Sequence, residues 1–237
     1  MRKALLLLVV WAGIAAGCDS KEEEYVPQSM GYDYYPLAVG DYRIYDVTDI
    51  KFQHNVGDTT RYQLKERVDM TFYDQTNTLN YKIRRSVRPD ANSRWKDDSV
   101  LVVSKTDLMV LLTQDNTTYV KLVFPVKEGK AWEGDAYNNR TVGNVKERYS
   151  YSSVGESFFV NGVTYDTTVT VVQGQPTDDM NRLDDRQEVY AKGVGLVYRL
   201  LNRVAFSPCT PDQCEFGENF KLDGRERHER LVSYGKE

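Results

Sequence analysis

The sequence contains only two histidines and three cysteines, and long runs of basic residues are absent. A Ser-His-Asp site would have to use His54 or His228, yet no Gly-x-Ser-x-Gly elbow is present, and no His-Glu-x-x-His zinc motif occurs either. The net charge is −4, and no clustered basic face is apparent, which argues against a nucleic-acid partner. We therefore expect no enzyme, no cofactor, no metal site and no nucleic-acid binding.

The first seventeen residues have the pattern of a secretion signal. Arg2 and Lys3 are followed by an apolar stretch at 4–16 that is shorter than the ~20 residues needed to span a bilayer. Small residues then precede Cys18, and the segment resembles the bacterial lipobox, in which this cysteine is lipidated. The resemblance implies that acyl chains such as palmitate on Cys18 attach the protein to a membrane. An ordinary signal peptide is the alternative.

This pattern divides the chain into three parts. We expect a lipoprotein signal peptide at 1–17, the lipidated cysteine and an acidic tether at 18–30, and a single β-rich domain at 31–237. The polar run 19–24 resembles the export signal of surface-exposed lipoproteins of Bacteroidota, and a generic linker is the alternative. The expected location is the cell envelope, with the protein lipid-anchored in the outer membrane and facing the periplasm or the cell surface.

Alternation of apolar and polar residues dominates the rest of the chain, and no segment keeps a helical period. Residues 61–72 and 79–87 flank a turn-rich joint and predict a hairpin. Further strands are expected at 42–52, 99–104, 108–113, 118–124, 145–153, 158–160, 163–165, 167–172, 187–191, 196–206 and 230–234. The pattern predicts an all-β, mainly antiparallel fold: a single curved sheet, a sandwich or a partly closed barrel of about 9–12 strands.

Several local features refine this prediction. Asn161-Gly162 predicts a two-residue hairpin turn, because both residues tolerate a positive φ. Glu66 and Arg85 interrupt otherwise apolar strand faces, and 177–186 is interpreted as a loop or a short helical turn. A basic cluster is interpreted as the solvent side of a strand, and it comprises Lys82, Arg84, Arg85 and Arg88.

The remaining cysteines, Cys209 and Cys214, are expected to form a disulfide, which secretion permits and which would stabilise the fold by roughly 2 kcal/mol. Free thiols are the alternative. Four acidic residues offer oxygen ligands for Ca²⁺ or simply form a solvated loop: Asp178, Asp179, Asp184 and Asp185. Three short motifs resemble the O-glycosylation acceptor of Bacteroidota, with Thr59, Ser99 and Thr167 as acceptors.

Tyrosine is abundant, with 17 residues in the chain. Stacked tyrosines could form a platform for a sugar or a peptide, because the ring is apolar and its tip is polar. Tyrosine is also simply favoured in β-sheets. The groups in question are Tyr32, Tyr34 and Tyr35 before the first strand, and Tyr149 and Tyr151 within a later one.

Three segments carry a family resemblance. Residues 34–45 contain Pro-Leu-x-x-Gly-x-x-x-x-Tyr, residues 188–198 contain Tyr-Ala-x-Gly-Val-Gly-Leu-Val, and residues 121–132 lie between them. In this order they resemble uncharacterised outer-membrane lipoproteins of Bacteroidota. The resemblance implies a membrane-anchored β-domain and brings no established activity.

The sequence thus favours a non-catalytic binding or structural β-domain that is anchored through Cys18 and has an envelope protein or a glycan as its partner. One alternative is a carrier that holds an apolar ligand in a β-barrel cavity. Another is a hydrolase of envelope glycans, which needs two carboxylates about 5–9 Å apart in a cleft.

Overall fold

The computed structural model describes residues 30–138, 147–174, 176–209, 212 and 214–237. Apart from the short 3₁₀ helix η2 (Tyr32–Tyr34), the regular elements are all strands, and every strand pairing is antiparallel. The predicted all-β class is confirmed. The strands are β1 (Asp41–Gln53), β2 (Val56–Tyr73), β3 (Leu79–Arg88), β4 (Lys96–Lys105), β5 (Met109–Gln114), β6 (Thr117–Val123), β7 (Ala131–Glu133), β8 (Arg148–Ser152), β9 (Phe158–Val160), β10 (Val163–Tyr165), β11 (Thr168–Gln173), β12 (Thr177–Asp178), β13 (Arg182–Ala191), β14 (Gly195–Phe206) and β15 (Lys221–Lys236).

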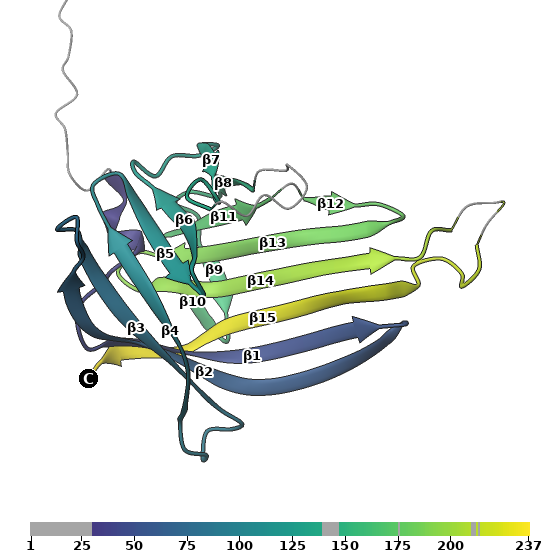
Figure 1. The fold of residues 1–237 in the computed structure, drawn as a ribbon, viewed down its shortest axis with the longest axis horizontal. Coiled ribbons are helices and arrows are strands. Elements are labelled where there is room, and N and C mark those ends of the chain that lie inside the picture. The colour runs from purple at the N-terminus through teal and green to yellow at the C-terminus, as the bar shows by residue number, and fades with distance from the viewer. Residues whose placement is uncertain (1–29, 139–146, 175, 210–211, 213) are drawn as a thin grey trace, which may run out of the picture.

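One large sheet contains most of these strands (Figure 1). Its order is β6-β5-β4-β3-β2-β1-β15-β14-β13-β11-β8-β7, with β12 paired to β13, while β9 and β10 form a separate hairpin. The predicted pairing of β2 with β3 is confirmed, and so is the Asn161-Gly162 turn, whose φ angles are 48° and 80°. Short turns between alternating segments therefore fix much of the order along the sheet.

The two edges of the large sheet meet. The amide of Val120 on β6 donates to the carbonyl of Gly134 just after β7 at 2.8 Å, and the indole of Trp132 donates to the carbonyl of Val120 at 2.9 Å. The hydroxyl of Tyr151 on β8 bonds both the N–H and the C=O of Val123, at 2.9 and 2.8 Å. The curved sheet is thus a partly closed barrel.

The apolar core fills this barrel because alternate residues of each strand point inward. Burying one such side chain stabilises the fold by about 1.5–3 kcal/mol relative to leaving it exposed. Among the most deeply buried are Val47, Leu64, Val103, Val110, Leu122, Val169, Val171 and Val197.

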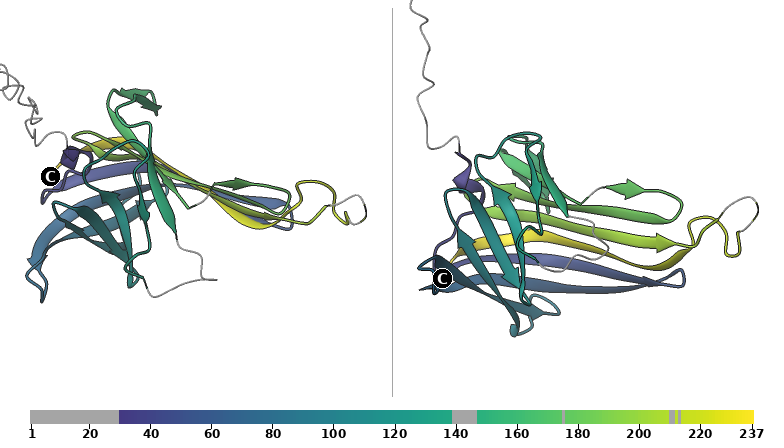
Figure 2. Two further views of the ribbon diagram at one scale, coloured as in Figure 1. Left: turned by 90° about the horizontal axis from the view of Figure 1, so that it is seen from above. Right: turned by 45° about the horizontal axis from the view of Figure 1, so that its top comes forward.

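Beyond the barrel, β1, β2, β13, β14 and β15 continue as a single-layered arm, visible on the right of Figure 1 and in both views of Figure 2. We call the paired residues 48–53, 56–61, 182–187, 200–206 and 221–228 the arm. On the arm, Asp184 pairs with Arg186 on the same strand at 2.6 Å and with Arg203 on the neighbouring β14 at 3.2 Å. Ion pairs within and between strands therefore stabilise the arm.

Three predictions are wrong in their details. Residues 182–186 belong to β13 and Thr177–Asp178 form β12, so the polar stretch there is largely extended, because it pairs along the arm. β15 is far longer than the predicted 230–234 for the same reason. Arg85 faces the interior and is only 8% exposed, unlike the solvent position expected for it.

Among the described residues, no helix has the length and apolar character needed to cross a membrane.

Candidate functional site

The segment 30–39, which leads into β1, covers one end of the barrel. The ammonium of Lys105 donates to the carbonyls of Tyr32 and Tyr35 at 2.7 and 2.8 Å, and the buried Tyr34 donates to the carbonyl of Thr168 at 3.4 Å. These bonds tie the segment to β4 on one side and to β11 on the other. The cap therefore joins the two halves of the curved sheet.

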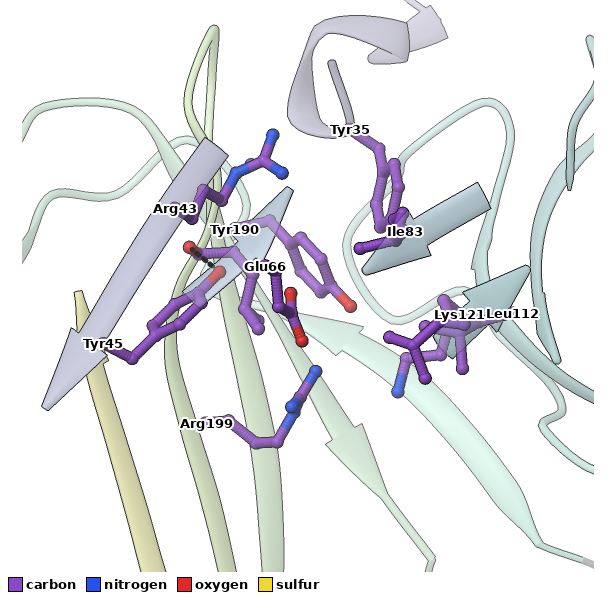
Figure 3. A pocket seen from close by; sticks show the side chains of 12 residues that line it. Tyr35, Arg43, Tyr45, Glu66, Ile83, Leu112, Lys121, Tyr190 and Arg199 are labelled. Carbon is purple, nitrogen blue, oxygen red and sulfur yellow. Dashed lines mark hydrogen bonds between the residues drawn. The ribbon is translucent and has the colours of Figure 1, made fainter. Parts of the chain in front are cut away.

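A small polar chamber lies beneath this cap (Figure 3). Tyr35 reaches into it from the cap, and Glu66 and Tyr190 point toward the same space. Its volume is about 10 Å³, which is room for about one water molecule. The full lining is Tyr35, Arg43, Tyr45, Glu66, Ile83, Leu101, Leu112, Lys121, Tyr190, Gly195, Leu196 and Arg199.

A network of buried charges borders the chamber. Glu188 accepts from the ammonium of Lys121 at 2.6 Å and from the guanidinium of Arg199 at 2.8 Å. Arg199 also donates to Glu229 at 2.6 Å, and both carboxylates have side chains only 2% exposed. Buried charges of this kind persist only when they are paired and hydrogen-bonded, and this network meets that condition.

The network keeps its carboxylates ionised. Burial by itself raises the pKa of Glu188, but Lys121 and Arg199 outweigh burial and hold that pKa at about 2. Burial likewise opposes ionisation of Glu229, whose pKa is nevertheless lowered, with Arg199 as the strongest cause. Both carboxylates are therefore ionised, Glu188 paired with Lys121 and Arg199 and Glu229 paired with Arg199.

A second hollow, which we call the outer groove, lies on the other face of the sheet. The β9–β10 hairpin stands out from this face, opposite to β4, β5 and β6 (Figure 2, left). The groove between the hairpin and the sheet has a volume of about 430 Å³. Its lining is Phe158, Phe159, Val160, Asn161, Gln187, Tyr198 and Arg230.

Two successive side-chain contacts hold the ring of Tyr198 in the outer groove, from Tyr198 to His228 and from His228 to Glu226. The hydroxyl of Tyr198 lies 2.9 Å from Nδ1 of His228, and Nε2 of the same histidine lies 2.8 Å from Oε1 of Glu226. Phe158 packs on Tyr198 with ring centroids 5.6 Å apart. Burial raises the pKa of Tyr198, so its hydroxyl stays protonated at neutral pH. These contacts fix the position of the Tyr198 ring in the groove.

The structure places the predicted cysteine sites in different ways. Cys18 lies outside the described residues, so its lipidation stays a prediction. Cys209 and Cys214 form the predicted disulfide. The suggested glycosylation residues lie on separate elements: Thr59 is exposed on β2, Ser99 is half-buried on β4, and Thr167 is half-buried before β11.

The acidic residues proposed for Ca²⁺ are not brought together as a cage. Asp179 accepts from the amides of Asn181 and Arg182, at 2.8 and 2.9 Å, and so forms a local turn. Asp184 pairs with arginines on the arm instead. Within the described ranges, no group of three or more His, Cys, Asp or Glu residues is arranged to hold a metal ion.

The tyrosines singled out from the sequence do not form an exposed platform. Tyr32, Tyr34 and Tyr35 build the cap, and Tyr149 and Tyr151 are buried at the barrel seam. Sequence reasoning missed the aromatic residues of the outer groove. A signal was present, because consecutive Phe158 and Phe159 on a short strand must point to opposite faces, which leaves one of them exposed.

Comparisons with known proteins add two solved structures. A candidate exported protein with a YmcC-like fold from Bacteroides fragilis is 13% identical, with a TM-score of 0.41, over 85% of this chain and 98% of the other. A candidate lipoprotein from Parabacteroides distasonis is 10% identical, with a TM-score of 0.36, over the same shares of the two chains. No family model and no curated protein matches the chain. Neither structural likeness assigns an activity.

Proposed function

We propose that this protein is a lipid-anchored lipoprotein of the cell envelope whose β-domain binds a ligand or partner without catalysis. The outer groove is the observation that carries the binding role. Its volume of about 430 Å³ lies within the ~300–1,000 Å³ range of small-molecule sites. Its lining combines aromatic rings with a few polar side chains, as such sites commonly do.

The anchoring part rests on the lipobox at Cys18, and the assignment to outer-membrane lipoproteins of Bacteroidota rests on the motifs in 34–45 and 188–198. Two or more acyl chains give durable membrane attachment, since each buried CH₂ contributes about 0.8 kcal/mol. Inhibiting signal peptidase II with globomycin should make the uncleaved precursor accumulate. Metabolic labelling with a fatty-acid analogue should label the native protein and Ser20→Ala, whereas Cys18→Ala should carry no label. Labelling of the Cys18→Ala protein at the native level contradicts the anchor.

The binding part is tested by placing a photo-crosslinking phenylalanine analogue at position 159 in living cells. Phe159 lines the outer groove and is 68% exposed, so the substitution leaves the core intact. The same analogue at Phe216, which is 51% exposed and outside the groove, is the matched control. We expect adducts at 159 in excess of those at 216. Equal numbers of adducts at positions 159 and 216, or no adducts at either, would contradict the proposed binding role.

The alternative functions have less support. A carrier of an apolar ligand needs a large apolar cavity, whereas the chamber has a volume of about 10 Å³ and is lined partly by charged residues. A glycan hydrolase needs a pair of carboxylates in a cleft, and the lining of the outer groove contains none. The structural observations therefore favour binding at the outer groove.

A further inference from the structure

The floor of the outer groove is built by three neighbouring strands. Tyr198 on β14 lies directly across from Arg230 on β15, and Gln187 comes from β13 on the other side. Phe158 and Phe159 on β9 form the facing wall. A ligand in the groove would therefore meet aromatic rings and polar tips together.

The wall is fixed in place before any ligand binds. The amide of Asn161 donates to the carbonyl of Leu231 at 3.0 Å, and Val160 is only 6% exposed. The segment before β9 is also held, because Thr168 donates through its backbone and its hydroxyl to the carbonyl of Glu156, at 2.8 and 2.9 Å. A preformed groove costs little ordering entropy on binding.

Polar groups in the groove are left for a ligand. Within the described part of the chain, the side-chain amide of Gln187 has no hydrogen-bond partner, and the guanidinium of Arg230 has only the face of Tyr198, 5.9 Å from the ring centroid. The amide both donates and accepts, and the guanidinium donates. A purely apolar ligand would remove the water that bonds both groups and would offer no hydrogen bond in its place, which is unfavourable.

The charges around the groove disfavour an anionic ligand. Asp46 lies directly across from Arg230 on β1, and both Asp185 and Glu226 act electrostatically on Tyr198. Arg230 is the single charged side chain in the lining itself, and these three carboxylates around it offset the positive charge that an anionic ligand would need. The ligand that fits is neutral, ring-shaped and rich in groups that both donate and accept hydrogen bonds.

We infer that the outer groove binds a neutral saccharide, with a pyranose ring packed on the exposed ring of Phe159 and with hydroxyls bonded to Gln187 and Arg230. This inference rests on the proposed function and names its ligand class. An extended peptide fits less well, because β9 is three residues long and offers a short edge for strand addition. For a single ring, the ligand efficiency of small ligands suggests a dissociation constant on the order of 1 mM.

The test uses the full protein purified in detergent from the cells that produce it. Neutral tetrasaccharides of glucose, mannose, galactose and N-acetylglucosamine are titrated, with tetragalacturonate as the acidic counterpart of the galactose probe. Ligand-observed NMR measures affinity, and the side-chain amide signals of Gln187 and Asn161 report the location. We expect at least one neutral tetrasaccharide to bind and to shift these amide signals, with an affinity that barely changes with salt.

Variants complete the test. Phe159→Ala and Gln187→Ala should each weaken binding about three- to tenfold, because each removes one stacking or hydrogen-bonding contact. Phe216→Ala should leave binding unchanged. Preferred binding of tetragalacturonate, or an affinity indifferent to both groove variants, overturns the inference.

The two proposals fail in different ways. If photo-adducts form at position 159 but no saccharide shifts the amide signals, the groove binds another class of partner, such as a peptide, and only the saccharide inference falls. If neither adducts nor shifts appear, the proposed binding role falls as well.

Discussion

Glu188 accepts three hydrogen bonds within the interior charge network. Its carboxylate accepts from Lys121, from Arg199 and, at 2.6 Å, from the hydroxyl of Tyr190. Removing one partner of a buried ion pair leaves the other charge uncompensated, which typically costs about 3–5 kcal/mol.

Replacing Glu188 with glutamine should therefore destabilise the protein by about 3–5 kcal/mol, measured as the free energy of unfolding in urea. Asp97→Asn is the matched control, because Asp97 pairs with Arg84 at the surface and its side chain is 67% exposed. The control should cost no more than about 1 kcal/mol. Equal losses in the two variants would show that the buried network contributes no special stability.

Glu188 also makes the free energy of unfolding depend on pH. The pKa of Glu188 is about 2 in the folded protein, below its ordinary value of 4.5, so the unfolded chain takes up the proton first as the pH falls. Its contribution, about 3 kcal/mol, is complete above pH 4.5 and is lost between about pH 4.5 and 2. Urea unfolding at stepped pH should show this decline. Glu188→Gln should show a shallower one, and identical slopes would contradict the assignment.

Glu66 and Arg85 show why interior charges are hard to predict from one strand at a time. Each interrupts an apolar alternation, and in the structure they lie on paired strands, with Nε of Arg85 3.4 Å from the carboxylate of Glu66. The apolar alternation put both residues on the inward face, but the basic cluster around Arg85 predicted a solvent position for it, and neither pattern could identify the ion-pair partner. Pairing between strands decides whether such a break is exposed or paired within the barrel.

Among the elements, the entry to β1 depends on a glycine. Gly40 has a φ of 90°, and a Cβ there would overlap the carbonyl oxygen of Glu237, the residue after β15. Gly129 has a similar φ of 72°, yet no atom lies within 4 Å of the position of its Cβ. Alanine at Gly129 would therefore meet backbone strain alone, whereas alanine at Gly40 would meet both backbone strain and steric overlap.

Gly129→Ala should cost about 1–2 kcal/mol, the usual penalty for a left-handed backbone in an L-residue. Gly40→Ala should cost at least twice as much, because β15 must also move away from β1. Thermal unfolding of the two variants measures the difference. Equal shifts in melting temperature would mean that Glu237 can move away from residue 40 without loss of stability.

Strands were predictable wherever one face meets the core. β1 and the hairpin β9–β10 match their predicted bounds to within one residue, because apolar alternation and turn residues mark them. The arm was not predictable in the same way. Residues 182–186 and 221–229 carry few apolar side chains, and their extended form depends on cross-strand pairing with distant segments. The outer groove depends on those same long-range pairings.

At the scale of the whole molecule, closure of the barrel depends on few bonds. The hydroxyl of Tyr151 supplies two of them, both to the backbone of Val123 at the edge of β6. Tyr151→Phe keeps the ring and removes both, so it should cost about 1–3 kcal/mol, since buried backbone groups lose their partners.

Hydrogen exchange should also become faster at the amide of Val123, while the amides between β1 and β15 keep their protection. Tyr73→Phe is the control, because Tyr73 lies on β2 and is 65% exposed. Unchanged exchange at β6 in the Tyr151→Phe protein would mean that packing alone holds the seam.

The position of β15 has a consequence for how the chain reaches this fold. β15 is the last described strand, and it lies between β1 and β14 near the middle of the sheet. Strands β1 to β6 can pair in the order of synthesis, and so can β11, β13 and β14, but β1 and β14 are bridged within the sheet by β15, at residues 221–236. Such long-range pairing is slow and comes late. If the chain is exported, the sheet therefore lacks the strand between β1 and β14 until residues 221–236 have passed through the translocation pore.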